Sequence, residues 1–193
     1  MRNLSNIYKG IVIVLLLVCA PRVAQAQKWA VSTNALSWLN VGTINAEGSR
    51  SFGKHLTLHA GFTANPWSMY TPTNVELKNQ QYGGYAGVRY WPVYAYMDWW
   101  IGAKLQYKNF EEAGLLTRNL LKGDALGAGL SGGYSFLISD HVNLDFGLGI
   151  WGGRLVTYKK YKGAEEIEDQ IEDKGPRNFI FLDNVMVSLV YIF

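Results

Sequence analysis

Apolar and polar residues alternate along several segments of the chain, most clearly in its second half. From Val142 to Ile150, every second residue is apolar, and the residues between them are polar or glycine. The same alternation starts at Trp99 and at Leu56, and it returns from Val185 to Phe193. Side chains of an extended strand point to opposite faces in turn, so this pattern predicts strands with one apolar face.

The alternation predicts eight strands in all. They are expected at residues 28–37, 42–51, 54–64, 81–91, 95–108, 122–137, 141–158 and 178–193. Most of these segments reach the roughly 9–11 residues that a tilted strand needs to cross the hydrocarbon layer of a membrane. We therefore predict an all-β fold, an eight-stranded antiparallel up-and-down transmembrane β-barrel.

The connections between the strands fall into two groups. Short turns are expected around Gly53, at 92–93 and at 139–140, whereas long loops are expected at 65–80, 109–121 and 159–177. Outer-membrane barrels have short turns on the periplasmic side and long loops outside the cell. The pattern predicts a bacterial outer-membrane location with both termini in the periplasm, although the first outer connection, 38–41, is short.

Aromatic residues gather at the predicted strand ends. Rings with an apolar body and a polar edge favour the membrane–water interface. The residues expected there are Trp29, Trp38, Trp67, Trp91, Trp99, Tyr191 and Phe193. A terminal aromatic on an apolar strand face also resembles the signal that the outer-membrane assembly machinery recognises. The alternative is a buried C-terminal strand of a soluble sandwich.

The first 26 residues have the features of a cleaved signal peptide, which leaves residues 27–193 as the barrel domain. Arg2 and Lys9 precede an apolar run, and 24–26 reads Ala-Gln-Ala, a small-residue cleavage site. Without this segment, three of 18 basic residues are lost and 15 remain against 15 acids. The only cysteine, Cys19, is lost as well. Nothing therefore favours nucleic acid as a partner, or a disulfide framework.

Four charged residues are expected to point into the barrel. They are Glu47, Arg89, Lys104 and Asp145. The interior of an eight-stranded barrel is just wide enough to fill with side chains, and buried charges there must pair. We predict a structural salt-bridge network that plugs the lumen. A narrow ion path through it is the alternative.

No residue pattern indicates catalysis, a cofactor or a metal. His55 and His141 begin strands at the short-turn side, and His59 is expected to face the lumen. An enzyme that modifies lipid A would need a histidine near the outer leaflet that activates a serine or a water. Four residues apart on one strand, His55 and His59 lie roughly 13 Å from each other and cannot chelate one ion.

Two long loops are candidate contact surfaces. The last one carries an acidic cluster, which is our candidate partner loop: Glu165, Glu166, Glu168 and Asp169. It is suited to bridging divalent cations to lipopolysaccharide or to docking a surface protein, and the alternative is a solvated loop without a partner. The loop at 65–80 exposes Trp67, which is expected to contact interface lipids or a partner.

Several short motifs occur in a characteristic order. They are Thr33-Asn34-Ala35-Leu36, Glu47, Asn65-Pro66-Trp67, Arg89-Tyr90-Trp91, Gly127-Ala128-Gly129, Gly132-Gly133-Tyr134, Gly147-Leu148-Gly149 and the ending from Ser188 to Phe193. In this order the chain resembles a Bacteroidota family of small outer-membrane β-barrels, classed as a domain of unknown function. The resemblance implies the fold and the membrane, and it brings no catalytic residues.

Three functions follow from these features. The first is a non-enzymatic outer-membrane barrel that has a structural role or anchors a surface or fimbrial partner through its loops, in contact with lipid and lipopolysaccharide. The second is a lipid A-modifying enzyme. The third is a soluble secreted barrel with a ligand in its lumen, which would require an apolar interior and a polar exterior, the reverse of the predicted faces.

Overall fold

The computed structural model describes residues 29–39, 42–70, 76–113, 120–161, 171–173 and 175–193. Its elements are β1 (Trp29–Asn34), α2 (Ala35–Leu39), β2 (Ile44–Phe52), β3 (Leu56–Asn65), β4 (Ser68–Tyr70), β5 (Glu76–Tyr90), β6 (Asp98–Ala113), β7 (Leu120–Ser139), β8 (Val142–Tyr161), β9 (Ile171–Asp173) and β10 (Arg177–Ile192). The predicted signal peptide, 1–26, lies outside the described residues. In the described ranges, no helix has both the length and the apolar character needed to cross a membrane.

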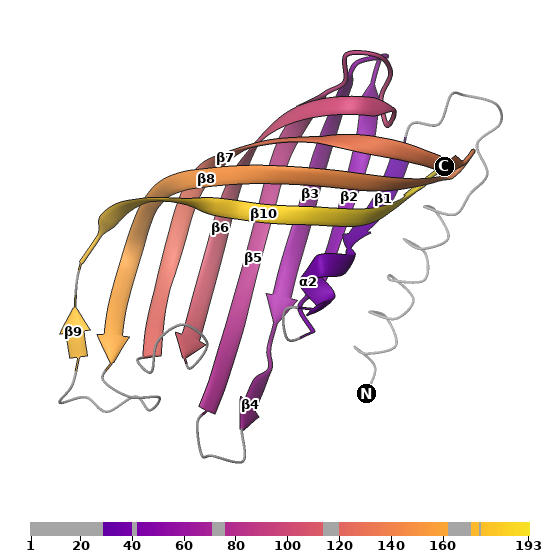
Figure 1. The fold of residues 1–193 in the computed structure, drawn as a ribbon. Helices are drawn as coiled ribbons and strands as arrows, with labels where there is room; N and C mark the ends of the chain where they lie inside the picture. The colour runs from indigo at the N-terminus through magenta and orange to yellow at the C-terminus, as the bar shows by residue number, and fades with distance from the viewer. Residues whose placement is uncertain (1–28, 40–41, 71–75, 114–119, 162–170, 174) are drawn as a thin grey trace, which may run out of the picture.

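Eight strands form a closed ring (Figure 1). Neighbours pair in the order β1, β2, β3, β5, β6, β7, β8 and β10, and β10 returns to pair with β1. Every pairing is antiparallel, and the short strands β4 and β9 extend the hairpins beside β5 and β8. The predicted eight-stranded antiparallel barrel is confirmed.

The strands are tilted against the barrel axis. We start at Val31 on β1 and move from each residue to its paired residue on the next strand. This path around the ring ends at Ile180 on β10. The closing pair, however, joins Val31 to Tyr191, far along the same strand. Such a stagger is what tilted strands need to close a barrel. In Figure 1, β7, β8 and β10 accordingly cross the direction of β3 and β5 at a large angle.

The outside of the barrel is apolar and the inside is polar. At mid-strand, Leu105 and Leu130 are 70% and 63% exposed, whereas the polar Glu47 and His59 are 8% and 6% exposed. We call the outward-facing apolar residues along the strands the outer belt; they include Leu58, Val88, Leu105, Leu130, Ile150 and Val185. The faces are the reverse of those of a water-soluble protein.

The first strand is shorter than the sequence predicts. We expected it to reach residue 37, but β1 ends at Asn34 and the helix α2 follows. The side-chain Oδ1 of Asn34 accepts a hydrogen bond from the backbone N of Leu36 (3.1 Å). Asn34 thereby caps the helix, as asparagine commonly does, and this bond ends the strand.

The short β1 leaves one edge of β10 without a neighbouring strand. β1 pairs with β10 only from Ser188 to Ile192. Next along this edge, Asn34 accepts a hydrogen bond from Val187 N (3.1 Å) and donates one to Val185 O (3.4 Å). Within the described ranges no strand pairs with this edge from Arg177 to Val187, and α2 packs beside β10 instead.

The other strands run further toward the long-loop end than predicted. β5 starts at Glu76, β6 ends at Ala113 and β8 ends at Tyr161. Much of the predicted loop 65–80 is therefore the hairpin of β4 and β5. The alternation is weak there, because charged and polar residues occur on both faces of the strands between the outer belt and the long loops.

Candidate functional site in the barrel interior

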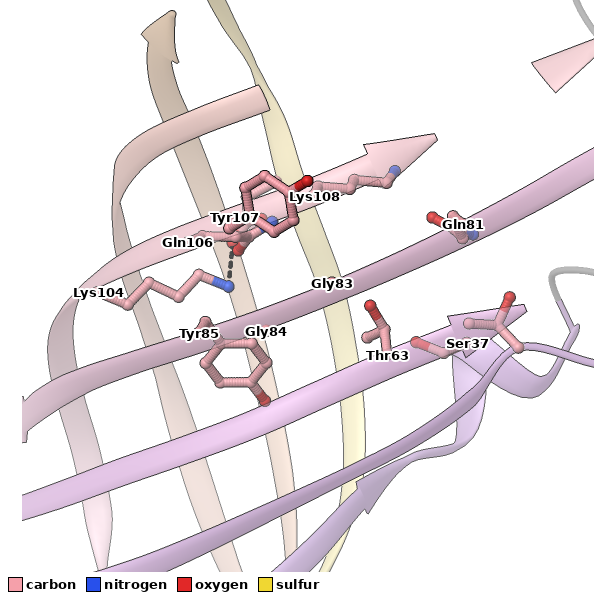
Figure 2. Close-up of a pocket in the computed structure, with 12 residues that line it drawn as sticks. Ser37, Thr63, Gln81, Gly83, Gly84, Tyr85, Lys104, Gln106, Tyr107 and Lys108 are labelled. Atoms are coloured by element: carbon pink, nitrogen blue, oxygen red, sulfur yellow. Dashed lines mark ion pairs between the residues drawn. The ribbon is translucent and has the colours of Figure 1, made fainter. Parts of the chain in front are cut away.

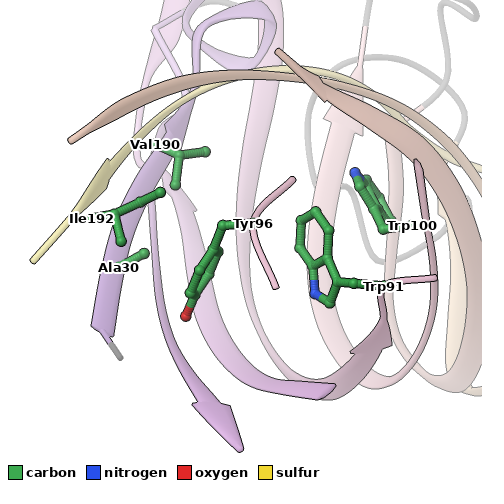
Figure 3. Close-up of a cluster of buried hydrophobic side chains, with 6 residues drawn as sticks. All are labelled: Ala30, Trp91, Tyr96, Trp100, Val190 and Ile192. Carbon is green, nitrogen blue, oxygen red and sulfur yellow. The ribbon is translucent and has the colours of Figure 1, made fainter. Parts of the chain in front are cut away.

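A folded-in turn seals the short-turn end of the barrel. The connection from Trp91 to Met97 places Trp91 and Tyr96 inside, where they pack with Trp100 (Figure 3). Strands β1 and β10 complete this cluster, which we call the aromatic plug: Ala30, Trp91, Tyr96, Trp100, Val190 and Ile192. Trp91 is 0% exposed. The expectation that Trp91 lies at the membrane interface is therefore wrong.

Hydrogen bonds fix this turn in an unusual backbone conformation. Tyr96 has a φ of 68°, which residues other than glycine rarely adopt. Its carbonyl oxygen accepts hydrogen bonds from Ser135 Oγ and Asn143 Nδ2, and its hydroxyl accepts one from Ser49 Oγ. Trp91 Nε1 donates to Thr57 Oγ1 (3.1 Å). Four polar side chains on four strands thus hold the turn inside, which the strand pattern alone does not reveal.

Next to the aromatic plug, toward the long-loop end of the barrel, lies a charged cluster around Glu47. Arg89 Nη2 is 2.8 Å from Glu47 Oε1 and 3.0 Å from Oε2. The same carboxylate accepts a hydrogen bond from Tyr85 OH (2.9 Å), and His59 Nδ1 lies 3.0 Å from it. All of these groups are buried or half-buried, so the carboxylate is satisfied by partners rather than by water.

Arg89 connects the charged cluster to the aromatic plug. Its guanidinium carbon lies 4.7 Å from the ring centroid of Trp100, a cation–π distance. A glycine pair makes room for the indole: an added Cβ on Gly133 or Gly147 would lie 2.6 Å or 2.9 Å from Trp100. The plug and the cluster are therefore one packed unit across the lumen.

The other two predicted lumen charges have separate partners. Asp145 Oδ1 lies 2.5 Å from Ser135 Oγ, which also accepts a hydrogen bond from Asn143 Nδ2. Lys104 pairs with Asp183 on β10, with Nζ 2.6 Å from Oδ2, and its ammonium lies 4.6 Å from the ring centroid of Tyr85. The structure thus brings Glu47 and Arg89 into direct contact, and it joins Lys104 to a residue that sequence reasoning missed.

Asp183 was missed because of a β-bulge. Counting back in twos from the outward-facing Phe193 would put Asp183 on the outside. The pairing of β10 with β8 shifts between Leu182 and Asn184, however, and this turns Asp183 inward. The sequence does contain a signal for this inward turn. Plain alternation would place Asp183 alone on an otherwise apolar outer face, and a charge in such surroundings is energetically unfavourable.

Toward the long-loop end, the lumen contains a polar cavity of about 170 Å³, which we call the upper cavity (Figure 2). It is lined by β3, β5, β6, β10 and α2, through residues that include Ser37, Thr63, Tyr85, Lys104, Gln106, Lys108 and Asp183. A smaller cavity of about 30 Å³ lies deeper, beside Glu47, Arg89 and Asp145. Toward the short-turn end, the charged cluster and the aromatic plug close the lumen.

The histidines hold structural positions. His55 Nδ1 lies 2.9 Å from the carbonyl oxygen of Trp91, and His141 Nδ1 lies 3.0 Å from that of Ile192. His59 belongs to the Glu47 cluster. Among the described residues there is no group of three or more acids, histidines or cysteines suited to a metal ion.

One polar cluster faces outward above the outer belt. Asp124 accepts hydrogen bonds from Tyr107 OH (2.6 Å), Asn109 Nδ2 (2.9 Å) and Thr157 Oγ1 (2.6 Å). The carboxylate is therefore engaged on both oxygens. Thr157 also accepts a hydrogen bond from Asp124 N, so the cluster joins β6, β7 and β8 at their polar ends.

The remaining predicted interface aromatics are at the surface. Trp29, Trp38, Trp67, Trp99, Tyr191 and Phe193 are all at least 39% exposed. At the short-turn end, the guanidinium of Arg50 stacks near Trp29 and Phe52, with centroid distances of 5.0 Å and 5.2 Å. The candidate partner loop, Glu165, Glu166, Glu168 and Asp169, lies outside the described residues.

Comparison with known proteins assigns a family but no activity. No curated protein and no solved structure matches the chain. A family model described as "Protein of unknown function (DUF3575)" matches residues 11–193, which is nearly the whole chain. The match says nothing about Bacteroidota or about a membrane, so both remain predictions. The chain belongs to the DUF3575 family of proteins of unknown function.

Proposed function

We propose that this chain is a non-enzymatic bacterial outer-membrane barrel, closed to solutes, that has a structural role or anchors a surface partner through its long-loop end. One observation carries the proposal: an apolar outer belt surrounds a polar lumen in which Glu47 pairs with Arg89 and Lys104 with Asp183. A membrane is the solvent that favours this arrangement, because lipid takes up the apolar outside and the closed ring of strands pairs most of its backbone groups. A soluble ligand-binding barrel would have the reverse faces.

The rims of the barrel support the same proposal. Exposed aromatic residues lie at both ends of the strands, as expected for membrane interfaces. Trp29 N donates to Phe193 O, so the first and last described residues meet at the short-turn end. In the proposed orientation this end faces the periplasm, the outer-membrane assembly machinery recognises β10, and the long-loop end contacts lipopolysaccharide or a surface or fimbrial protein.

We further propose that the barrel neither catalyses a reaction nor conducts ions. The outward Asp124 cluster lies where a lipid A-modifying site would be expected, but its described contacts include no histidine, and its carboxylate is occupied by three donors. The aromatic plug and the Glu47 cluster pack against each other across the lumen, which supports a barrel closed to ions. Identical lipid A mass spectra from deletion and wild-type cells would support the absence of catalysis, and a changed acyl pattern would contradict it.

The membrane location is tested by fractionation and by gel mobility. We expect the protein in the outer-membrane fraction, with a folded band that migrates differently from the heated one. Recovery as a soluble periplasmic protein would refute the proposal.

A substitution in the outer belt tests the same proposal energetically. Leu130→Arg should lower the free energy of unfolding in lipid vesicles by about 2–4 kcal/mol, because arginine at the bilayer midplane must leave water. The matched control is Leu137→Arg near the short-turn end, where the cost should be about 0–1 kcal/mol. Both leucines are more than half exposed. Equal, small effects in urea titrations would indicate that water surrounds the belt.

A further inference from the structure

The upper cavity carries one loosely paired cation. Lys104 is held by Asp183 at 2.6 Å, but Lys108 Nζ lies 3.9 Å from Glu112 Oε1, and the Lys108 side chain is 28% exposed. Both lysines line the cavity, and among the described residues its only lining acid is Asp183. Among the described residues, the lining therefore has an excess of one positive charge, located at Lys108.

The same cavity contains an acceptor that lacks a donor. Gln106 lines the cavity beside both lysines (Figure 2), and its buried Oε1 has no hydrogen-bond partner in the described structure. Leaving a buried acceptor unpaired costs about 1–3 kcal/mol. A cation next to an unpaired acceptor is suited to a ligand that has both a negative charge and a hydroxyl group.

The wall beside this cavity is thin on one side. Ser37 of α2 and Asp183 of β10 line the cavity, whereas Trp38 and Leu39 of α2 are 55% and 82% exposed on the outside. Here α2 replaces a strand, and the edge of β10 from Arg177 to Val187 has no strand partner in the described ranges. The polar cavity and the apolar exterior are therefore separated by little more than one turn of helix.

We propose that this cavity binds the hydroxyl-bearing phosphate headgroup of a membrane amphiphile, which enters between α2 and β10 while its acyl chains remain outside. Lysine binds phosphate well as a point charge. One phosphodiester charge offsets the excess charge at Lys108, and a headgroup hydroxyl donates to Gln106. The inference rests on the proposed membrane location, because only lipid presents such a headgroup at the side of the barrel.

The test measures binding to the full protein purified from membranes in a nonionic detergent. Short-chain phosphatidylglycerol is the probe, glycerol 1-phosphate is the free phosphoglycerol group as a phosphomonoester without chains, and short-chain phosphatidylcholine is the zwitterionic lipid without hydroxyls. We expect saturable binding of phosphatidylglycerol by calorimetry. Glycerol 1-phosphate and phosphatidylcholine should each bind at least about tenfold more weakly.

Substitutions assign the binding to the cavity. Lys108→Gln should weaken phosphatidylglycerol binding about tenfold, because one hydrogen bond to a charged group contributes about that factor. Gln106→Leu should also weaken it, by removing the acceptor. The matched control is Lys122→Gln, which removes a lysine that pairs with Glu111 at 3.7 Å on the neighbouring strand, outside the cavity lining. Binding to this control should be unchanged.

Each other outcome overturns the inference. Equal binding of glycerol 1-phosphate would mean that a free solute occupies the cavity, and equal binding of phosphatidylcholine would exclude charge recognition. An equal loss of phosphatidylglycerol binding in Lys122→Gln would indicate nonspecific attraction to the positive charges at the long-loop end. A lack of saturable binding would mean that the cavity is not a binding site. Because fractionation and Leu130→Arg report on the membrane location separately, failure of the binding test is distinguishable from failure of the proposed function.

Discussion

Arg89→Met should lower the free energy of unfolding by about 3–5 kcal/mol, the range seen when one partner of a buried ion pair is removed. Arg89 is the only described cation in direct contact with Glu47, and it also lies on the Trp100 ring. Methionine keeps much of the apolar stem of arginine but leaves a buried carboxylate without its counter-charge. Urea titration of the protein in lipid vesicles measures the loss.

Two further variants separate the charge effect from the packing effect. Arg50→Met makes the same change at an exposed position near Trp29 and Phe52, where the loss should stay below about 1 kcal/mol. Combining Arg89→Met with Glu47→Gln should restore part of the lost stability, since both members of the ion pair are then neutral. If Arg89→Met were no more destabilising than Arg50→Met, the charged cluster would not hold the barrel together.

Trp91→Ala should lower the free energy of unfolding by about 3–5 kcal/mol, as large-to-small changes in packed cores do. Trp91 is fully buried, its ring centroid is 5.8 Å from that of Tyr96 and 6.2 Å from that of Trp100, and its indole N–H bonds Thr57. Alanine would leave a void at the centre of the aromatic plug. Urea titration in vesicles is again the measurement.

The control for this change is Trp99→Ala, one of the exposed aromatics at the same end. Trp99 is 65% exposed and contacts Tyr134 edge to face, at a centroid distance of 5.1 Å. Losing this contact and the interfacial position should lower the free energy of unfolding by less than half as much as Trp91→Ala does. Equal effects at both positions would contradict the placement of Trp91 inside the barrel, where the structure has it, and would favour the interface position that the sequence suggested.

The aromatic plug and the Glu47 cluster act together as the closure of the lumen. Arg89 links them, since it bonds Glu47 on one side and stacks on Trp100 on the other. Gly61 serves the same closure, because an added Cβ there would lie 2.5 Å from the Tyr85 ring, which reaches across to Glu47. Glycines on the inner face thus leave room for the large side chains that fill a narrow barrel.

The sequence by itself determined the barrel and its two faces. Period-2 alternation is a local property of each strand, so the exposure of Leu130 and Ile150 and the burial of Glu47 and Arg89 could be read before any pairing was known. The grouping of short turns and long loops then predicted that both ends of the barrel domain lie on the short-turn side, where Trp29 and Phe193 meet. An antiparallel chain of eight such strands has few ways to bury its polar faces other than closure.

Only the tertiary structure decided which inward groups meet. The stagger of the tilted strands brings Arg89 to Glu47, and the bulge at Asp183 supplies the partner of Lys104. The turn that carries Trp91 and Tyr96 folds inward because groups on four other strands bond it, and Asn34 ends β1 by capping α2. Apart from the cap at Asn34, which is a local contact, these outcomes depend on contacts between residues that are far apart in the chain, and local alternation contains no information about such contacts.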